Sequence, residues 1–186
     1  MVTRSNELKK LEAIYPSDSN NLVLMYGRLG CGKENLLGSF TTGKNYFYYR
    51  SRQCSDAKQL QYMSQQIKES YSVSTSFDSF ADCFKAIAPK NGDKLVVVID
   101  DAGYAIKKTN DLLANLVSLK KGNLISNKVM IILTSASIVW GESTFDDIAG
   151  TTKSVVDERI KLENLSFLDL VRAFPSYSVA ECVSTY

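Results

Sequence analysis

The chain has 186 residues, of which 45% are hydrophobic and 23% charged, and its net charge is +2. This length predicts one domain with room for a small appendage, and so small a charge argues against a nucleic-acid partner for this chain. It has no histidine and no cysteine pair spaced for a zinc site, so we expect no histidine chemistry and no zinc site. It also has no apolar run of the roughly 20 residues that cross a bilayer and no apolar signal-peptide core, so we expect a cytoplasmic protein.

The first elements lead into the most informative stretch of the chain. Leucine and isoleucine recur at three-residue steps between Ser5 and Ile14, which predicts a helix. The turn-forming residues 16–21 end it, and the apolar run 22–26 predicts a buried strand. The segment from Gly27 to Lys33 then has the spacing Gly-x-x-x-x-Gly-Lys of the phosphate loop, or Walker A motif, and another helix follows.

This loop predicts a phosphate-binding site. Its glycines allow backbone N–H groups to turn inward around an anion, Lys33 can reach the β- and γ-phosphates, and the following helix directs its positive end to the same place. The predicted nucleotide-binding residues are Gly27, Arg28, Leu29, Gly30, Cys31, Gly32, Lys33 and Glu34. The alternative is a glycine-rich strand-to-helix turn with a solvated lysine.

The residue after Lys33 departs from the motif. A serine or threonine at this position would place a hydroxyl group on the magnesium ion of the nucleotide, but the chain has Glu34. A carboxylate repels phosphates unless a metal ion lies between them. We therefore expect nucleotide binding, with ordinary magnesium chemistry in question.

Downstream, strand patterns alternate with helix patterns. Expected strands are residues 45–50, 95–99, 129–133 and 159–162. Expected helices begin at Ser55 or Asp56, at Asp78, at about Thr109 and at Ser166, and residues 140–150 are expected to be irregular. This alternation predicts a parallel α/β sheet, in which ligands bind beyond the carboxyl ends of the strands.

The strand pattern at 95–99 ends in two aspartates. Apolar residues followed by Asp100 form a Walker B signature, in which the aspartate holds magnesium directly or through water. Asp101 stands where many ATPases carry a glutamate that polarises the attacking water, and its side chain is one methylene shorter. The alternative is a strand-end turn, where aspartate is common.

In the order of these motifs the chain resembles the archaeal-type ATPases of the AAA-related P-loop class, which also occur widely in bacteria. The matching segments are Arg4 with residues 7, 8 and 11, and then 26–33, 98–101, 131–135, 159–167 and 174–175. The resemblance implies a P-loop NTPase three-layer sandwich, with a mostly parallel sheet of about five strands in which the Walker A and Walker B strands are adjacent. It also implies ATP and Mg²⁺ as cofactors, Asp100 as metal ligand, Asp101 as catalytic residue and Ser135 as the polar sensor after the fourth strand.

Three departures from the family pattern bear on activity. Glu34 replaces the hydroxyl residue, Asp101 replaces the usual glutamate, and residues 153–157 contain no arginine where the family usually has a Gly-Arg pair. We expect an ATP-binding module with weak or lost hydrolysis and no support for a trans-acting arginine finger. The alternative is a nucleotide-free interaction module that keeps the fold, in which Glu34 pairs with Lys33.

The end of the chain indicates a second unit. We expect residues 1–165 to form the ATPase-like domain and residues 166–186 to begin a helical lid, because Ser178 and Glu181 form a capping-box pattern that opens a helix. The family normally continues with a helical lid and a winged-helix region. We therefore expect a module of a longer protein, or a divergent remnant of one, with a C-terminal domain or another protein as partner.

Overall fold

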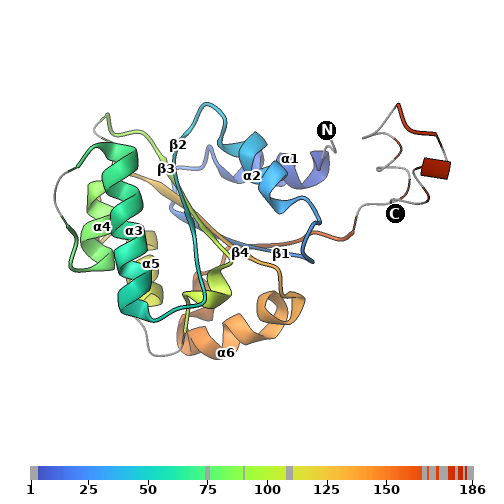
Figure 1. Cartoon of the computed structure of the whole chain (residues 1–186). Helices are drawn as coiled ribbons and strands as arrows, with labels where there is room; N and C mark the ends of the chain where they lie inside the picture. The colour runs from blue at the N-terminus through green and yellow to red at the C-terminus, as the bar shows by residue number, and fades with distance from the viewer. Residues whose placement is uncertain are drawn as a thin grey trace.

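The computed structural model describes residues 4–73, 76–89, 91–107 and 111–164, together with residues 167, 171, 176–178, 180, 181 and 183 (Figure 1). The helices are α1 (Ser5–Ile14), α2 (Lys33–Thr41), α3 (Asp56–Tyr71), α4 (Phe80–Ala86), α5 (Asp111–Lys120) and α6 (Phe145–Ala149). The strands are β1 (Asn21–Tyr26), β2 (Asn45–Arg50), β3 (Leu95–Asp100), β4 (Val129–Ser135) and β5 (Glu158–Lys161). Each strand lies within one or two residues of its predicted position.

The strands form one parallel sheet in the order β2-β3-β4-β1-β5, with helices on both faces (Figure 1). Helices α1 and α2 pack on one face, and α3, α4, α5 and α6 pack on the other, each side with its own hydrophobic core. Every residue of β1, β3 and β4 is buried, which explains the unbroken apolar runs of these strands. The predicted α/β sandwich with about five strands is confirmed.

The predicted contact between the Walker A and Walker B strands is wrong. Strand β4 lies between β1 and β3 and pairs with both. The crossover through α5 sets β4 beside β3, and β4 can fill a central position because it is buried along its whole length. The consequence is that Thr134 and Ser135, at the end of β4, lie between the phosphate loop and Asp100.

Two local predictions also need correction. Residues 140–150 are helical, with a π-helical turn at Trp140–Thr144 that leads into α6, and the buried rings of Trp140 and Phe145 pack edge to face at 5.4 Å. The segment is too short to show a helical period in the sequence. Helix α4 is capped by Ser79, whose hydroxyl accepts the N–H of Asp82 at 3.1 Å, rather than by Asp78.

The C-terminal predictions fall largely outside the described residues. Most of the helix expected from Ser166 lies among residues that are not described, although residues 167 and 171 are helical, and the start expected near Thr109 is also not described. The capping box is formed, because the N–H of Ser178 donates to Glu181 Oε2 at 2.7 Å and the N–H of Glu181 donates to Ser178 Oγ at 3.3 Å. The division into two units at residue 165 stays a prediction. Within the described residues no helix has the length and apolarity that crossing a membrane requires.

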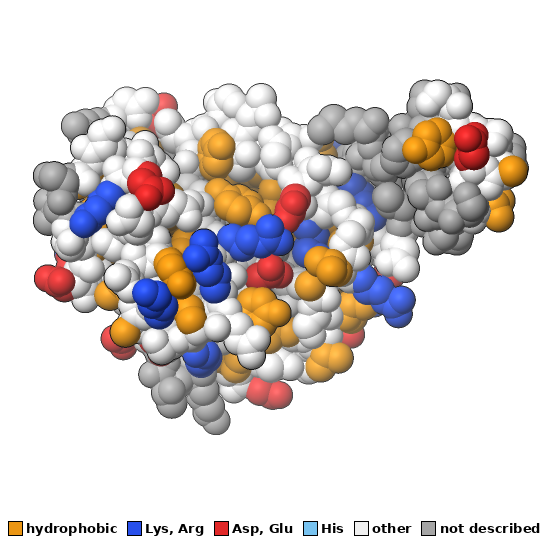
Figure 2. All heavy atoms as spheres, in the orientation of Figure 1, with side chains coloured by type: hydrophobic (Ala, Val, Ile, Leu, Met, Phe, Trp, Pro, Cys, Tyr) orange, Lys and Arg blue, Asp and Glu red, His pale blue; other side chains and the backbone are white. Residues whose placement is uncertain are grey.

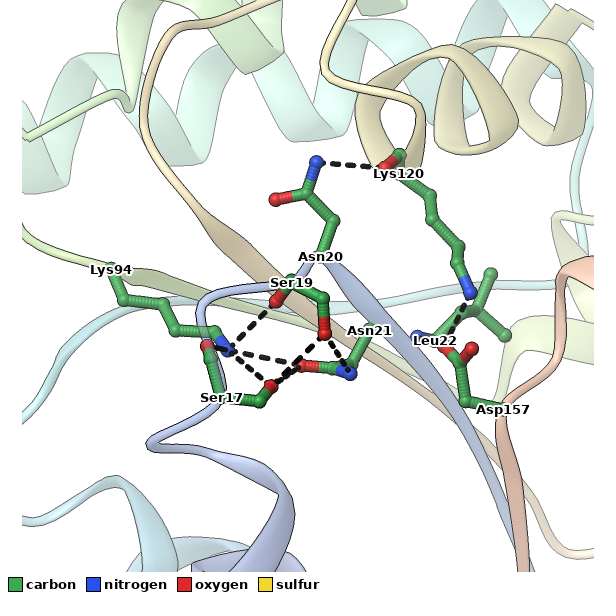
Figure 3. A network of polar contacts seen from close by, with 8 residues as sticks. All are labelled: Ser17, Ser19, Asn20, Asn21, Leu22, Lys94, Lys120 and Asp157. Atoms are coloured by element: carbon green, nitrogen blue, oxygen red, sulfur yellow. Dashed lines mark hydrogen bonds and ion pairs between the residues drawn. The ribbon is translucent and has the colours of Figure 1, made fainter.

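A lysine ties two strands together at the amino end of the sheet, opposite the phosphate loop (Figure 3). The Lys94 amino group, just before β3, donates to Ser17 O at 2.9 Å, to Ser19 O at 3.1 Å and to Asn21 Oδ1 at 3.0 Å. These acceptors belong to the turn that leads into β1, so Lys94 holds the start of β1 against the start of β3. The described residues place no acidic side chain within ion-pairing distance of Lys94.

A second group fixes the neighbouring strands at the same end of the sheet (Figure 3). The side chain of Asn20 donates to Lys120 O at 2.7 Å and accepts the N–H of Val129 at 3.0 Å. Asp157 accepts the N–H of Leu22 at 2.7 Å and pairs with the Lys120 amino group. Together the two groups anchor β1 to helix α5, to strand β4 and to the segment before β5.

Replacing Lys94 by methionine should lower the free energy of unfolding by about 2 kcal/mol. Methionine keeps the aliphatic stem but leaves three oxygen acceptors without their common donor, and a partly buried acceptor without a partner costs about 1–3 kcal/mol. Urea unfolding checks this, with the exposed Lys9→Met as the control that should change little. Equal stability of Lys94→Met and Lys9→Met would show that the Lys94 contacts do not stabilise the fold.

Candidate nucleotide-binding site

The phosphate loop has a backbone that only glycine accommodates well. Gly30 and Gly32 have φ angles of 79° and 90°, in the left-handed region. A Cβ atom on Gly27 would stand 2.3 Å from the backbone oxygen of Leu162. The N–H of Gly27 also donates to Ser135 O at 3.2 Å, which ties the loop to the end of β4. All three glycines of the loop, the two of the motif and Gly30, are therefore required by the backbone.

Lys33 lies inside the loop rather than in solvent. Its side chain is largely buried, and its amino group donates to Gly27 O at 2.6 Å and to Arg28 O at 3.0 Å. Leu29, by contrast, is 85% exposed at the tip of the loop. The alternative of a solvated lysine is therefore wrong, and the charge of Lys33 is held where an anion in the loop would meet it.

Arg4 supports the loop from outside. Its guanidinium donates from Nε to Cys31 O at 3.1 Å and from Nη2 to Glu163 O at 2.6 Å, so it joins the loop to the residues that follow β5. Cys31 itself is buried beneath the loop, with its Sγ atom 3.7 Å from the Lys33 amino group. From the sequence, Arg4 was identified only as a position that matches the family, because its contacts join segments that are far apart in the chain.

Asp100 is buried at the end of β3, with both carboxylate oxygens engaged. The phenol of Tyr48 donates to Oδ2 at 2.6 Å, and the hydroxyl of Thr134 donates to Oδ1. Asp101 follows with a left-handed φ of 51°, and its N–H donates to Thr134 Oγ1 at 3.1 Å. Thr134 therefore positions both aspartates, which follows from the central place of β4. Tyr48 was not identified as a site residue from the sequence.

Glu34 pairs with Arg50 and not with Lys33. Glu34 Oε1 lies 2.8 Å from Arg50 Nη2, whereas the Lys33 amino group bonds to the loop carbonyls. Arg50 Nε also lies 3.4 Å from Asp100 Oδ2 and 3.5 Å from Asp101 Oδ2. The predicted Glu34–Lys33 pair is wrong because helix α2 directs the Glu34 side chain toward β2, out of the loop.

Arg50 is the site residue that the sequence analysis missed most completely. It is the last residue of β2 and lies in register with Asp100 on β3. Burial acts to lower the pKa of Arg50, but the carboxylates of Asp100, Glu34 and Asp101 outweigh it and raise that pKa above the ordinary value. The sequence signal was a single basic residue closing an aromatic strand, whose meaning depends on the strand order.

These residues enclose a cavity of about 340 Å³ between α2 and the carboxyl ends of the strands. It is lined by Leu29, Gly30, Gly32, Lys33, Glu34, Asn35, Arg50, Asp100, Asp101 and Ala136. Figure 2 shows basic and acidic side chains next to one another in the middle of the face on which β2 lies. The structure thus brings the two predicted motifs together around one hollow.

Four predicted site residues do not line this cavity. Gly27, Arg28 and Cys31 lie behind it, where the carbonyls of Gly27 and Arg28 hold Lys33. The hydroxyl of Ser135 accepts the N–H of Ser137 at 3.0 Å, and Ser135 lines a neighbouring cavity that shares Asp101 and Ala136 with the first. The sensor role of Ser135 stays a prediction.

The donor set at this position does not fit a magnesium ion as it stands. Among the described residues no group of three or more acidic, cysteine or histidine side chains is arranged to hold a metal. Both oxygens of Asp100 are engaged by hydroxyl groups, and Arg50 occupies the space between Glu34 and the two aspartates. Magnesium requires oxygen ligands in near-octahedral geometry. Here the carboxylate oxygens of Glu34, Asp100 and Asp101 are paired with the Arg50 guanidinium instead.

The Tyr48–Asp100 contact predicts a pH dependence of stability. Burial, with the hydrogen bond to Asp100 as the next cause, raises the pKa of Tyr48 above its ordinary value of 10.0. The unfolded chain loses this proton near pH 10 and the folded chain keeps it, so the stabilisation is complete below pH 10 and is lost as the pH rises further. The free energy of unfolding of Tyr48→Phe should therefore fall less steeply than that of the parent between pH 9 and pH 11.

Urea unfolding at several pH values measures this slope. Tyr104→Phe, which removes the hydroxyl of a half-exposed ring outside the Asp100 contacts, is the matched control and should follow the parent chain. A slope for Tyr48→Phe equal to that of the parent would contradict the assigned role of the phenol.

The family described as "ATPase domain predominantly from Archaea" matches residues 1–170. None of the curated protein sequences compared with this chain is detectably similar to it.

Solved structures with the same fold include three nucleotide-binding or Walker-type proteins. The Walker-type ATPase PABY2304 of Pyrococcus abyssi has a TM-score of 0.61 at 16% identity, and the alignment covers 100% of this chain and 62% of that one. The Aeropyrum pernix ORC2 protein in ADPNP-ADP complexes has a TM-score of 0.66 at 16% identity, covering 98% and 52%. AMPPCP-bound DnaA from Aquifex aeolicus has a TM-score of 0.56 at 15% identity, covering 95% and 53%.

These identities establish the fold and nothing finer, and the chain spans between 52% and 62% of the length of these three proteins. The family match extends from the first residue past β5, so it includes the phosphate loop and the aspartates of β3. The chain has the P-loop NTPase fold and belongs to the family of ATPase domains found predominantly in Archaea.

Proposed function

We propose that the chain binds ATP in the cavity beside the phosphate loop and hydrolyses it slowly or not at all. The observation that carries this proposal is the buried amino group of Lys33, held by the carbonyls of Gly27 and Arg28 at the N-terminus of α2. A cation and a helix N-terminus that meet at one point favour a phosphate group. The nucleotides in the ORC2 and DnaA structures lend support at the level of the shared fold.

The proposed binding step uses three parts of the site. Gly30 and Gly32, which line the cavity with a left-handed backbone, have no side chains, so phosphates can approach the backbone closely there. The Lys33 amino group exchanges its carbonyl partners for phosphate oxygens, which gives a charge-assisted contact in place of neutral ones. The Arg50 guanidinium, on the opposite wall, supplies the second positive charge.

Slow hydrolysis follows from the same contacts. Asp101 would have to orient the attacking water, but its carboxylate lies 3.5 Å from the Arg50 guanidinium. The position after Lys33 offers no hydroxyl group, and the Ser135 hydroxyl is used by Ser137. We expect a turnover rate at least about hundredfold below the 1 s⁻¹ that marks the slow end of ordinary enzymes.

Binding of a fluorescent ATP analogue to the folded chain tests the proposal. The expected dissociation constant is micromolar to submillimolar, with ATP and ADP displacing the analogue at least tenfold better than AMP, because the loop contacts phosphates beyond the first. Absence of binding at millimolar nucleotide would contradict it. Phosphate release measured on the same samples tests the expected low turnover.

A second candidate is an interaction module that binds no nucleotide. It is favoured by one observation, which is that Lys33, Glu34 and Asp100 all have partners within the chain. If the chain binds no nucleotide, ATP leaves its melting temperature unchanged. If it binds ATP, a concentration of a hundred times the dissociation constant stabilises the folded state by about 2.7 kcal/mol and raises the melting temperature. The partner, whether a further domain or another protein, is a proposal under both candidates.

A further inference from the structure

Arg50 stands at the centre of the acidic side of the cavity. Its guanidinium lies 2.8 Å from Glu34, 3.4 Å from Asp100 and 3.5 Å from Asp101, measured between nitrogen and carboxylate oxygen atoms. The three carboxylates come from α2 and from the end of β3, and Arg50 comes from the adjacent edge strand β2. One side-chain cation therefore connects every acidic group of the site.

We propose that the Arg50 guanidinium takes the place of the magnesium ion, so that the chain binds the free, metal-uncomplexed nucleotide. This inference rests on the proposed function. A metal ion at such a site lies between carboxylates and phosphates and balances their repulsion. Arg50 is paired with Glu34, Asp100 and Asp101, and all four side chains line the cavity that also contains Lys33.

The chemistry of the guanidinium group suits this position. It has five N–H donors in a fixed plane and stays charged at every pH at which the protein is folded. The ion pairs use Nε and Nη2, which leaves Nη1 for a phosphate oxygen. A carboxylate about 5 Å from a phosphate charge is repelled by roughly 3 kcal/mol at an effective dielectric constant near 20, and a cation placed between the two offsets this repulsion.

Strand pairing places the backbone of Arg50 directly beside Asp100. Arg50 is in register with Asp100, and the N–H of the next residue, Ser51, donates to Asp100 O at 2.9 Å. Tyr48, which lies on the same side of β2 as Arg50, donates its phenol hydrogen bond to the Asp100 carboxylate. Glu34, which departs from the motif of the family, therefore has an arginine partner that the strand pairing directs toward it.

The test compares nucleotide binding with and without the metal. The parent chain is titrated with a fluorescent ATP analogue in excess EDTA and again in excess Mg²⁺. We expect the two dissociation constants to agree within about threefold. Binding more than tenfold tighter in Mg²⁺ than in EDTA would overturn the inference and leave the proposed function standing, whereas no binding in either buffer would contradict the proposed function itself.

Variants of Arg50 identify the group responsible. Arg50→Met should weaken binding in EDTA by at least tenfold, and Arg50→Lys should recover part of that loss, because lysine keeps the charge without the planar donors. Arg52→Met is the matched control, since Arg52 stacks on the Tyr62 ring at 4.2 Å and does not line the cavity. Unchanged binding by Arg50→Met in EDTA would overturn the inference.

A double variant provides the reverse test. Glu34→Thr combined with Arg50→Met introduces the missing hydroxyl group and removes the cation that occupies the carboxylates, so binding should become at least tenfold tighter in Mg²⁺ than in EDTA. Thermal unfolding without nucleotide verifies that each variant is folded. If Arg50→Met does not fold, Arg50→Lys still tests the inference. A double variant that remains indifferent to Mg²⁺ would count against the substitution of the metal by Arg50.

Discussion

Lys33→Ala is expected to weaken binding of an ATP analogue by at least a hundredfold, which corresponds to about 2.7 kcal/mol. The Lys33 amino group is the cation held inside the loop, within hydrogen-bonding distance of the carbonyls of Gly27 and Arg28. A hydrogen bond to a charged group contributes about 1.5–3 kcal/mol, and the buried position strengthens it because water screens the charge less. Fluorescence titration of parent and variant under the same conditions measures the loss.

A matched lysine separates this effect from a general loss of positive charge. Lys9→Ala on the exposed face of α1 removes the same charge away from the cavity and should leave the affinity unchanged. The variant Lys33→Ala must also remain folded, which its circular dichroism verifies. Equal affinity of Lys33→Ala and the parent chain would show that the loop is not where the nucleotide binds.

Gly27→Ala should be the most destabilising single-methyl change in the loop. The added Cβ would lie 2.3 Å from the backbone oxygen of Leu162 and 2.9 Å from Cys31 Sγ. The first of these atoms cannot move alone, because the N–H of Leu162 donates to Tyr26 O at 2.7 Å. We expect a loss of about 3 kcal/mol or more in the free energy of unfolding, with nucleotide binding lost as the loop shifts.

Gly38→Ala is the control for that substitution. Gly38 lies within α2, one turn beyond the loop, and a Cβ there would meet no atom within 4 Å. Alanine in a helix interior is favoured over glycine by about 1 kcal/mol, so this variant should be more stable than the parent chain. Urea unfolding measures both variants, and a similar loss in each would contradict the specific clash at Gly27.

The fold was predictable where the chain determines its structure locally. The helix at Ser5–Ile14 and the strand at Asn45–Arg50 have the predicted bounds, because hydrophobic period and turn residues act over a few positions. The lateral order of the strands was not predictable in this way. Burial on both faces identifies β1, β3 and β4 as internal strands, but it does not say which of them lies in the middle.

The candidate site divides along the same line. The phosphate loop is continuous in sequence, and so its glycines and Lys33 were identified from their spacing alone. Tyr48 and Arg50 were missed because each reaches the site through strand pairing. Arg50 also changes the interpretation of Glu34, because the partner expected from the sequence was Lys33 and the partner in the structure is an arginine of β2.

A crystal structure of the chain with a non-hydrolysable ATP analogue shows directly whether the phosphate loop holds the nucleotide. We expect phosphate density within the Gly27–Lys33 loop, with the Lys33 amino group moved from the carbonyls of Gly27 and Arg28 to phosphate oxygens. We also expect the Arg50 guanidinium to lie between the phosphates and the carboxylates of Glu34 and Asp101. A loop without density at millimolar analogue, with Lys33 still bonded to its own carbonyls, would contradict this expectation.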